Sequence, residues 1–138
     1  MFDDKTLLIA DDELYLRESL AAFFKLRKAF KEIYFAATPK EASAVILANK
    51  PDITLLDIGQ GDALEGMDIL KEAKKILPAK CKIVMISGYR EYKDECFEIG
   101  ADGYVKKPFA LPELILFIAE VLKDQDAGSA GRKAQTPK

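Results

Sequence analysis

The segment Leu7-Leu8-Ile9-Ala10-Asp11-Asp12-Glu13 decides the fold, because an uninterrupted apolar run ends abruptly in carboxylates. Three other segments have the same character: Ile53-Thr54-Leu55-Leu56 ends in Asp57, Ile83-Val84-Met85-Ile86 ends in Ser87, and Tyr104-Val105 runs into Lys106-Lys107-Pro108. Runs without polar alternation are typical of parallel strands that helices cover on both faces. The carboxyl ends of such strands share one edge of the sheet. We therefore expect carboxylates, a hydroxyl and an ammonium group to meet there in one pocket.

Amphipathic segments alternate with these runs. Residues 13–28 predict a helix, because Leu16, Leu20, Phe23 and Phe24 recur at helical spacing. Further helices are predicted over 39–49 behind an N-cap at Thr38, and over 67–77, 90–99 and 111–123; strands are predicted over 5–10, 32–36, 53–57, 82–86 and 103–105. Strand–helix units with short connections predict a doubly wound α/β domain of the flavodoxin-like class, with a five-stranded parallel sheet in the order 2-1-3-4-5.

Composition limits the class of protein. The chain has 138 residues, of which 49% are hydrophobic and 32% charged, with a net charge of -2. This predicts one soluble globular domain over residues 1–123, followed by a disordered polar tail over 124–138. There is no basic stripe for nucleic acid, no apolar run of the ~18 residues that a membrane span needs, and no signal peptide. We therefore expect a cytoplasmic domain that binds neither nucleic acid nor membrane.

Two residue types narrow the chemistry. Histidine is absent, which excludes histidine-based triads, bases and metal ligands. The two cysteines, Cys81 and Cys96, match no metal or redox spacing, so we interpret them as reduced apolar residues. Any chemistry must depend on carboxylates, hydroxyls, lysines and the backbone.

The residues at the strand ends suit a hard cation and a phosphoryl group. Carboxylates attract Mg²⁺, and a carboxylate beside such a cation can attack phosphorus. Each residue also has a purely structural interpretation: Asp11 or Asp12 as a helix cap, Asp57 or Ser87 as a turn residue, and Lys106 and Lys107 as surface lysines. Their joint placement at four strand ends favours the functional interpretation.

The ordered motifs LLIADDE (Leu7–Glu13), LLD (Leu55–Asp57), VMISG (Val84–Gly88) and GADGYVKKPF (Gly100–Phe109) resemble the receiver domain of bacterial two-component response regulators. The resemblance extends over about residues 5–123. It implies a signalling regulator rather than an enzyme, which accepts a phosphoryl group on Asp57 from a sensor histidine kinase or phosphotransfer protein. It also implies a Mg²⁺ or Mn²⁺ site made by Asp11, Asp12, Asp57 and the carbonyl of Gly59.

The same resemblance assigns roles beside the acceptor. It implies that Ser87 and Lys107 contact the phosphoryl group, that Ser87 and Tyr104 form the switch, and that the Lys107–Pro108 bond is cis. Signalling would pass through the surface of the fourth helix, fifth strand and fifth helix to a downstream protein or into a homodimer. Leu116 and Phe117 are the residues we expect to point outward there.

Two features depart from the usual receiver pattern. No proline follows Asp57, and Gly66 lies one residue later than usual, which predicts a loop over 59–66 that Mg²⁺ or phosphate tightens. Tyr89, two residues after Ser87, could shield an aspartyl phosphate from water, which predicts slow autodephosphorylation.

Three alternatives remain beside this interpretation. A pseudo-receiver would keep the pocket and bind proteins without phosphate. A flavodoxin-like electron carrier would require Asp11, Asp12 and Glu13 to tolerate a flavin phosphate, which they would repel. A dinucleotide enzyme would require a G-x-G-x-x-G motif after the first strand, and none is present there.

Overall fold

The computed structural model of the protein describes residues 1–58, 63–123 and 134–135. Along the chain, the elements are β1 (Phe2–Ala10), α1 (Leu14–Leu26), β2 (Phe30–Ala36), α2 (Pro39–Asn49), β3 (Ile53–Asp57), α3 (Ala63–Ile76), β4 (Lys82–Ser87), α4 (Lys93–Ile99), β5 (Gly103–Lys106), α5 (Leu111–Lys123) and β6 (Ala134–Gln135). Strands and helices alternate as the sequence predicts.

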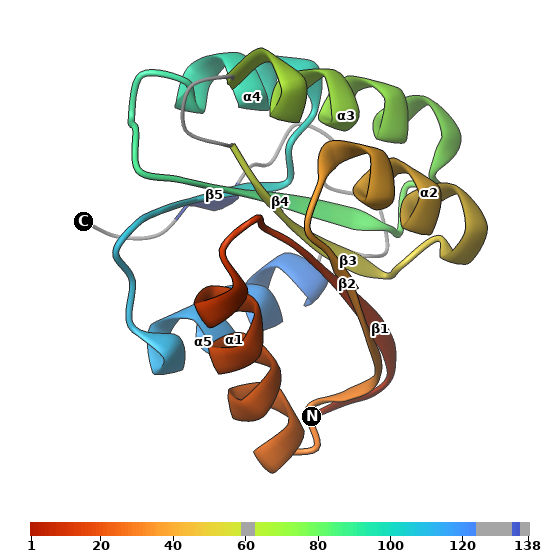
Figure 1. The fold of residues 1–138 in the computed structure, drawn as a ribbon, viewed down its shortest axis with the longest axis vertical. Coiled ribbons are helices and arrows are strands. Elements are labelled where there is room, and N and C mark those ends of the chain that lie inside the picture. Colours follow the sequence, from red (N-terminus) through yellow and green to blue (C-terminus); the bar gives the residue numbers. More distant parts are fainter. Residues whose placement is uncertain (59–62, 124–133, 136–138) are drawn as a thin grey trace.

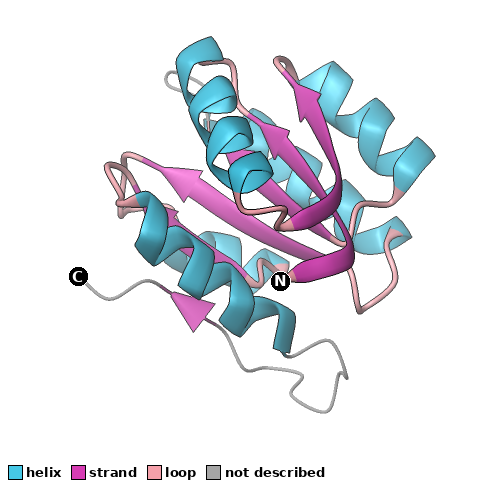
Figure 2. Ribbon diagram, turned by 90° about the horizontal axis from the view of Figure 1, so that it is seen from below, coloured by secondary structure: helices cyan, strands magenta, loops and turns pink. Residues whose placement is uncertain are grey.

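The strands form one parallel sheet in the order β2-β1-β3-β4-β5-β6. This confirms the predicted order 2-1-3-4-5. The two-residue β6 pairs with β5 and extends that order by one strand (Figure 2). These two residues lie within the tail that we expected to be disordered, and the other residues of that tail lie outside the described part of the chain.

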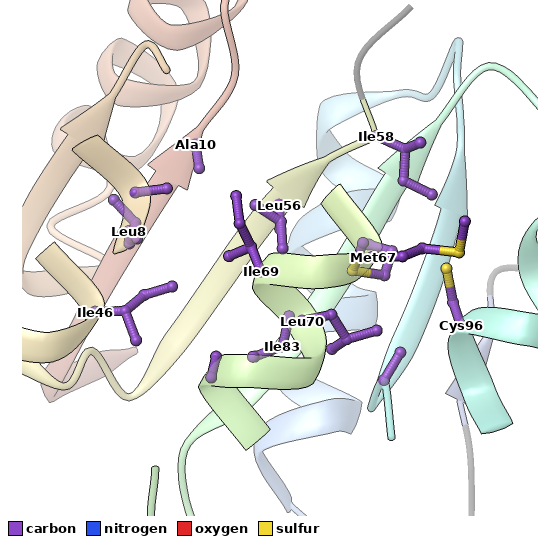
Figure 3. Close-up of a cluster of buried hydrophobic side chains, with 14 of the residues drawn as sticks. Leu8, Ala10, Ile46, Leu56, Ile58, Met67, Ile69, Leu70, Ile83 and Cys96 are labelled. Carbon is purple, nitrogen blue, oxygen red and sulfur yellow. The ribbon is translucent and has the colours of Figure 1, made fainter. Parts of the chain in front are cut away.

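Helices cover both faces of the sheet, with α1 and α5 on one side and α2, α3 and α4 on the other (Figure 1). Successive residues of β1 supply the two cores: Leu7 and Ile9 belong to the core under α1 and α5, and Leu8 belongs to the other. Figure 3 shows Ile69 and Leu70 of α3 within this second core. Burial of both faces explains why these strands are apolar without alternation.

Local signals explain several boundaries. The hydroxyl of Thr38 accepts a hydrogen bond of 3.1 Å from the Glu41 amide, and the Glu41 carboxylate accepts one of 2.7 Å from the Ala37 amide, so a capping box starts α2 as predicted. Gly100 caps α4 with φ 129°, a backbone conformation that favours glycine.

The starts of four elements differ from the predictions. Helix α3 begins at Ala63, four residues before the predicted start at Met67, and it includes Gly66. A Cβ at Gly66 would lie 3.3 Å from the Asp57 carbonyl oxygen, so glycine lets α3 approach the end of β3 closely. Helix α4 begins at Lys93 rather than at residue 90. Strands β1 and β2 begin early, because the Phe2 and Phe30 rings pack at 5.1 Å.

One side chain of α5 contradicts its prediction. Leu116 is 69% exposed, as expected, whereas Phe117 is buried. The Phe117 ring lies over Gly103, where an added Cβ would come within 2.9 Å of it. Helix α5 and β5 therefore approach each other closely only because residue 103 is a glycine.

The remaining compositional predictions concern membranes and thiols. None of the described helices has the length and apolar character needed to cross a membrane. Cys81 and Cys96 are buried and free, and both belong to the core beneath α3. Burial raises the pKa of the Cys96 thiol to about 11, with the neighbouring Glu95 adding to the effect, which suits an inert apolar role.

Candidate functional site

The carboxyl ends of β1 and β3 bring three aspartates together. Ala10 is paired with Leu56 across these strands, so Asp11 and Asp57 emerge side by side. Backbone hydrogen bonds hold the next residues in line: the Asp11 amide donates to the Ala36 carbonyl at 3.0 Å. One carboxylate oxygen from each of Asp11, Asp12 and Asp57 lies within 4.8 Å of the other two. This confirms that the predicted acidic residues share one pocket.

Asp11 is buried, and all of its polar groups are engaged. Its Oδ1 accepts a hydrogen bond of 2.8 Å from the Glu13 amide, and its Oδ2 accepts one of 3.1 Å from Lys107 Nζ. Its carbonyl accepts a hydrogen bond of 2.7 Å from Arg17 Nη1. The N-cap of α1 is Glu13, without a side-chain cap bond. Asp11 therefore shapes the turn before α1 and faces the pocket at the same time.

Lys107 connects two of the carboxylates. Its ammonium lies 3.1 Å from Asp11 Oδ2 and 3.0 Å from Asp57 Oδ1. The backbone that presents it is fixed, because its amide donates to the Ser87 carbonyl at 2.7 Å and the Lys107–Pro108 bond is cis, as the resemblance implied. The Nζ of Lys106 instead donates to the Lys107 carbonyl, at 3.2 Å. Lys107 is the pocket lysine of the pair.

Burial and crowding of negative charge dominate the electrostatics. Burial, reinforced by the charge of Asp11, raises the pKa of Asp57 from 3.8 to about 6, even though Lys107 opposes the change. For Lys107, burial alone would lower the pKa, but its hydrogen bond and charge interaction with Asp57 outweigh burial and raise it. One lysine does not neutralise this group of acids.

Ser87 ends β4, and Tyr104 lies within the neighbouring strand β5. Ser87 is fully buried, and its hydroxyl accepts a hydrogen bond of 2.9 Å from the Tyr89 amide. Tyr104 is also buried, and its hydroxyl donates to the Tyr89 carbonyl. Burial raises the pKa of the Tyr104 phenol, although a hydrogen bond with Ser87 opposes the change. These contacts join both predicted switch residues to the segment before α4.

Comparison with known proteins decides the family. The family described as the response regulator receiver domain matches residues 7–119. The chain belongs to the response regulator receiver family. It is 34% identical over 129 residues to the phosphate regulon transcriptional regulatory protein PhoB of Pseudomonas aeruginosa, covering 91% of this chain and 55% of that protein. The receiver chain thus spans about half the length of this curated relative.

Solved structures agree with this receiver assignment. A CheY-like receiver domain protein from Methanospirillum hungatei is similar with a TM-score of 0.80 and 31% identity, covering 90% of this chain and 98% of that one. The receiver domain of NtrX from Brucella abortus is similar with a TM-score of 0.73 and 32% identity. The match covers 85% of this chain and 98% of that one. The fold of this chain therefore recurs in receiver domains that are 31–32% identical to it.

Two features around the aspartates were missed from the sequence, a cavity and the contact of Arg17 with the Asp11 carbonyl. A cavity of about 140 Å³ continues from the aspartates between the starts of α2 and α3, where Thr38, Pro39 and Glu65 line it. Arg17 on α1 is the other, and a helical side chain that leans toward the N-terminus was the available signal. The predicted carbonyl ligand Gly59 lies outside the described residues, as does the part of the predicted loop over 59–62.

Proposed function

We propose that this receiver is a phosphorylation-dependent switch whose acceptor is Asp57. The observation that carries the proposal is the group of three carboxylates at one edge of the sheet, with Lys107 Nζ 3.1 Å from Asp11 Oδ2 and 3.0 Å from Asp57 Oδ1. With a pKa of about 6, Asp57 is largely ionised at neutral pH and is therefore nucleophilic. The family makes phosphoryl transfer the natural reaction for such a carboxylate.

The proposed reaction is a displacement at phosphorus. An oxygen of Asp57 forms a bond to the phosphorus of a phosphohistidine on a partner kinase or phosphotransfer protein, and the phosphorus–nitrogen bond breaks. The imidazole leaves with the bonding electron pair and takes up a proton. Lys107 pairs with a phosphoryl oxygen, and the Ser87 hydroxyl donates a hydrogen bond to another. Rate enhancement comes mainly from position and charge.

The residues present fit a divalent cation. Oxygen ligands in an incomplete shell are typical for Mg²⁺, and this pocket offers carboxylate oxygens within 4.8 Å of one another and an excess of negative charge. We expect Asp12 and Asp57 to bind the cation directly, Asp11 to act largely through water, and the Gly59 carbonyl to complete the shell. The chemistry that a bound Mg²⁺ or Mn²⁺ supplies is neutralisation of charge on the carboxylates and the phosphoryl group.

The proposed output passes through Ser87 and Tyr104. We expect the phosphoryl group to draw the Ser87 hydroxyl toward it and so to favour the buried position of Tyr104, which is the position in this structure. This would bias the surface of α4, β5 and α5, where Leu116 is 69% exposed. A downstream protein or a second copy of the chain would bind there. Light scattering with and without phosphodonor would detect the second copy.

Mass spectrometry after incubation with Mg²⁺ and acetyl phosphate tests the proposal. Wild type should gain the mass of one phosphoryl group, and Asp57→Ala should gain none. Asp94→Ala is a matched control, because Asp94 is an exposed acid on α4 away from the cavity. An unlabelled wild-type protein would instead favour a pseudo-receiver that binds its partners without phosphate.

A further inference from the structure

Arg17 holds the backbone beside the acidic pocket. From the first turn of α1, its Nη1 donates a hydrogen bond of 2.7 Å to the Asp11 carbonyl, and the side chain is half-buried. On the other side of the same residue, the Asp11 amide donates to the Ala36 carbonyl at 3.0 Å. The peptide unit that joins Asp11 to Asp12 is therefore clamped by a charge-assisted hydrogen bond.

The clamp matters because the next residue, Asp12, has little else to orient it. Asp12 is exposed, and within the described part of the chain no donor makes a hydrogen bond to its carboxylate. Asp11 already uses Oδ1 for the Glu13 amide and Oδ2 for Lys107. A cation in this pocket would thus rely on Asp12 and Asp57, and the direction of Asp12 follows from the peptide that Arg17 holds.

We propose that Arg17 is a positioning residue of the cation site, which aims the Asp12 carboxylate by fixing the Asp11–Asp12 peptide. The inference rests on the proposed function, since it concerns the cation that this function requires. Residues that orient metal ligands typically change metal affinity about 10–100-fold when they are substituted. Asp12 is exposed and only one peptide beside it is fixed, so we expect a loss of Mg²⁺ affinity at the lower end of that range, about tenfold.

The direction of the effect separates positioning from charge. Arg17 is a cation close to the proposed Mg²⁺ site, so loss of its charge alone would strengthen Mg²⁺ binding by removing repulsion. Loss of positioning would weaken it. A purely structural role of Arg17 would lower the melting temperature and leave Mg²⁺ affinity unchanged.

The test is a titration of the full chain with Mg²⁺ alone. Binding is measured by calorimetry and by the NMR shifts of the backbone amides of residues 10–13. Arg17→Gln should weaken Mg²⁺ binding about tenfold, and Arg17→Lys, which keeps the charge and one donor, should recover part of that loss. Arg27→Gln is the matched control, because Arg27 Nη1 also donates to a backbone carbonyl, that of Phe23 at 3.3 Å, at the far end of α1. It should bind Mg²⁺ as wild type does.

The outcomes are separable. If wild type does not bind Mg²⁺, the proposed cation site itself fails. If wild type binds and Arg17→Gln binds equally well or more tightly, the site stands and the positioning role of Arg17 is wrong. Wild-type affinity in Arg17→Lys together with tighter binding in Arg17→Gln would assign the whole effect to charge and would likewise overturn the inference.

Discussion

Two lysine–aspartate clusters near β4 and β5 differ in whether their charges balance. Near the start of β4, Asp102 Oδ2 accepts hydrogen bonds from Lys74 Nζ at 2.6 Å and from the Ile83 amide at 2.9 Å. At the other end of the sheet, Lys107 is shared between Asp11 and Asp57, with the oxygens of Asp12 also close. The first cluster has one anion for one cation, whereas the second has an excess of anions.

The difference separates a structural ion pair from a binding site. The Asp102 cluster joins α3 to β4 and to the residue before β5, and its partners all come from the described chain. In the Lys107 cluster, burial and the Asp11 charge raise the pKa of Asp57 to about 6, so the ionised form is disfavoured by its surroundings. A cation from solution would reduce this repulsion and stabilise the ionised Asp57. The Asp102 cluster needs no such cation, because its charges already balance.

The largest expected effect on stability is at the Asp102 cluster, where one anion faces one cation. Asp102→Ala should lower the free energy of unfolding by about 2–3 kcal/mol, because it leaves the Ile83 amide and a largely buried Lys74 without their acceptor. Urea unfolding measures this. Glu72→Ala is the control on the same helix: its contact with Lys75 is 3.5 Å long and exposed, so its loss should change stability by less than about 0.5 kcal/mol. Equal effects of both variants would contradict the structural role of Asp102.

Substitution of Asp57 in the Lys107 cluster should raise the free energy of unfolding, whereas substitution of Asp102 lowers it. Asp57→Asn should raise the free energy of unfolding by about 2 kcal/mol at pH 7 without divalent cations, because it removes an unfavourable buried charge. The folded-state pKa of Asp57 is raised from 3.8 to about 6. The protonated Asp57 side chain therefore stabilises the folded state. This stabilisation is fully present below pH 3.8 and is lost as the pH rises through about 6.

Denaturant unfolding between pH 4 and 7 would show this dependence. In wild type, the free energy of unfolding should fall across that window by about the same 2 kcal/mol, and in Asp57→Asn the fall should shrink. Addition of Mg²⁺ should reduce the fall in wild type only. A variant less stable than wild type at pH 7 would mean that Lys107 already balances Asp57.

The contrast between the clusters also explains what the sequence could reveal. The strands and the meeting of Asp11, Asp57 and Lys107 were predictable, because an apolar run buried on both faces needs no knowledge of its neighbours, and parallel strands end at a common edge. The starts of α3 and α4 could not be predicted from the sequence, because they depend on tertiary contacts. Gly66 packs against the end of β3, and the Tyr104 hydroxyl holds the segment before α4.

The role of Arg17 shows a second limit. Its partner is a backbone carbonyl, and any residue at position 11 would supply one. Such a contact leaves no complementary residue type in the sequence, whereas an ion pair leaves two. The same reasoning applies to Phe117, whose burial depends on the absence of a side chain at Gly103.

A smaller effect is expected at a third polar group, Thr54 in β3. It is fully buried between Leu8 of β1 and Ile83 of β4, and its hydroxyl has no hydrogen-bond partner among the described residues. Thr54→Val should raise the free energy of unfolding by about 1 kcal/mol, because it replaces an unpaired hydroxyl by a methyl group of similar size. Thr54→Ser keeps the hydroxyl and should not stabilise. If Thr54→Val destabilises, this hydroxyl is satisfied in solution.

The smallest effect is expected at Tyr89, whose amide donates a hydrogen bond to the Ser87 hydroxyl. Tyr89 is 41% exposed, and its ring packs edge-on against Tyr92 with centroids 5.9 Å apart. If this ring keeps water from an aspartyl phosphate, Tyr89→Ala should speed its loss about two- to threefold, which corresponds to about 0.5 kcal/mol in the barrier. The decay is followed by mass spectrometry after the phosphodonor is removed. Tyr15→Ala, at a 77% exposed tyrosine on α1, should decay like wild type. An unchanged decay rate in Tyr89→Ala would show that this ring excludes no attacking water and would overturn the shielding hypothesis.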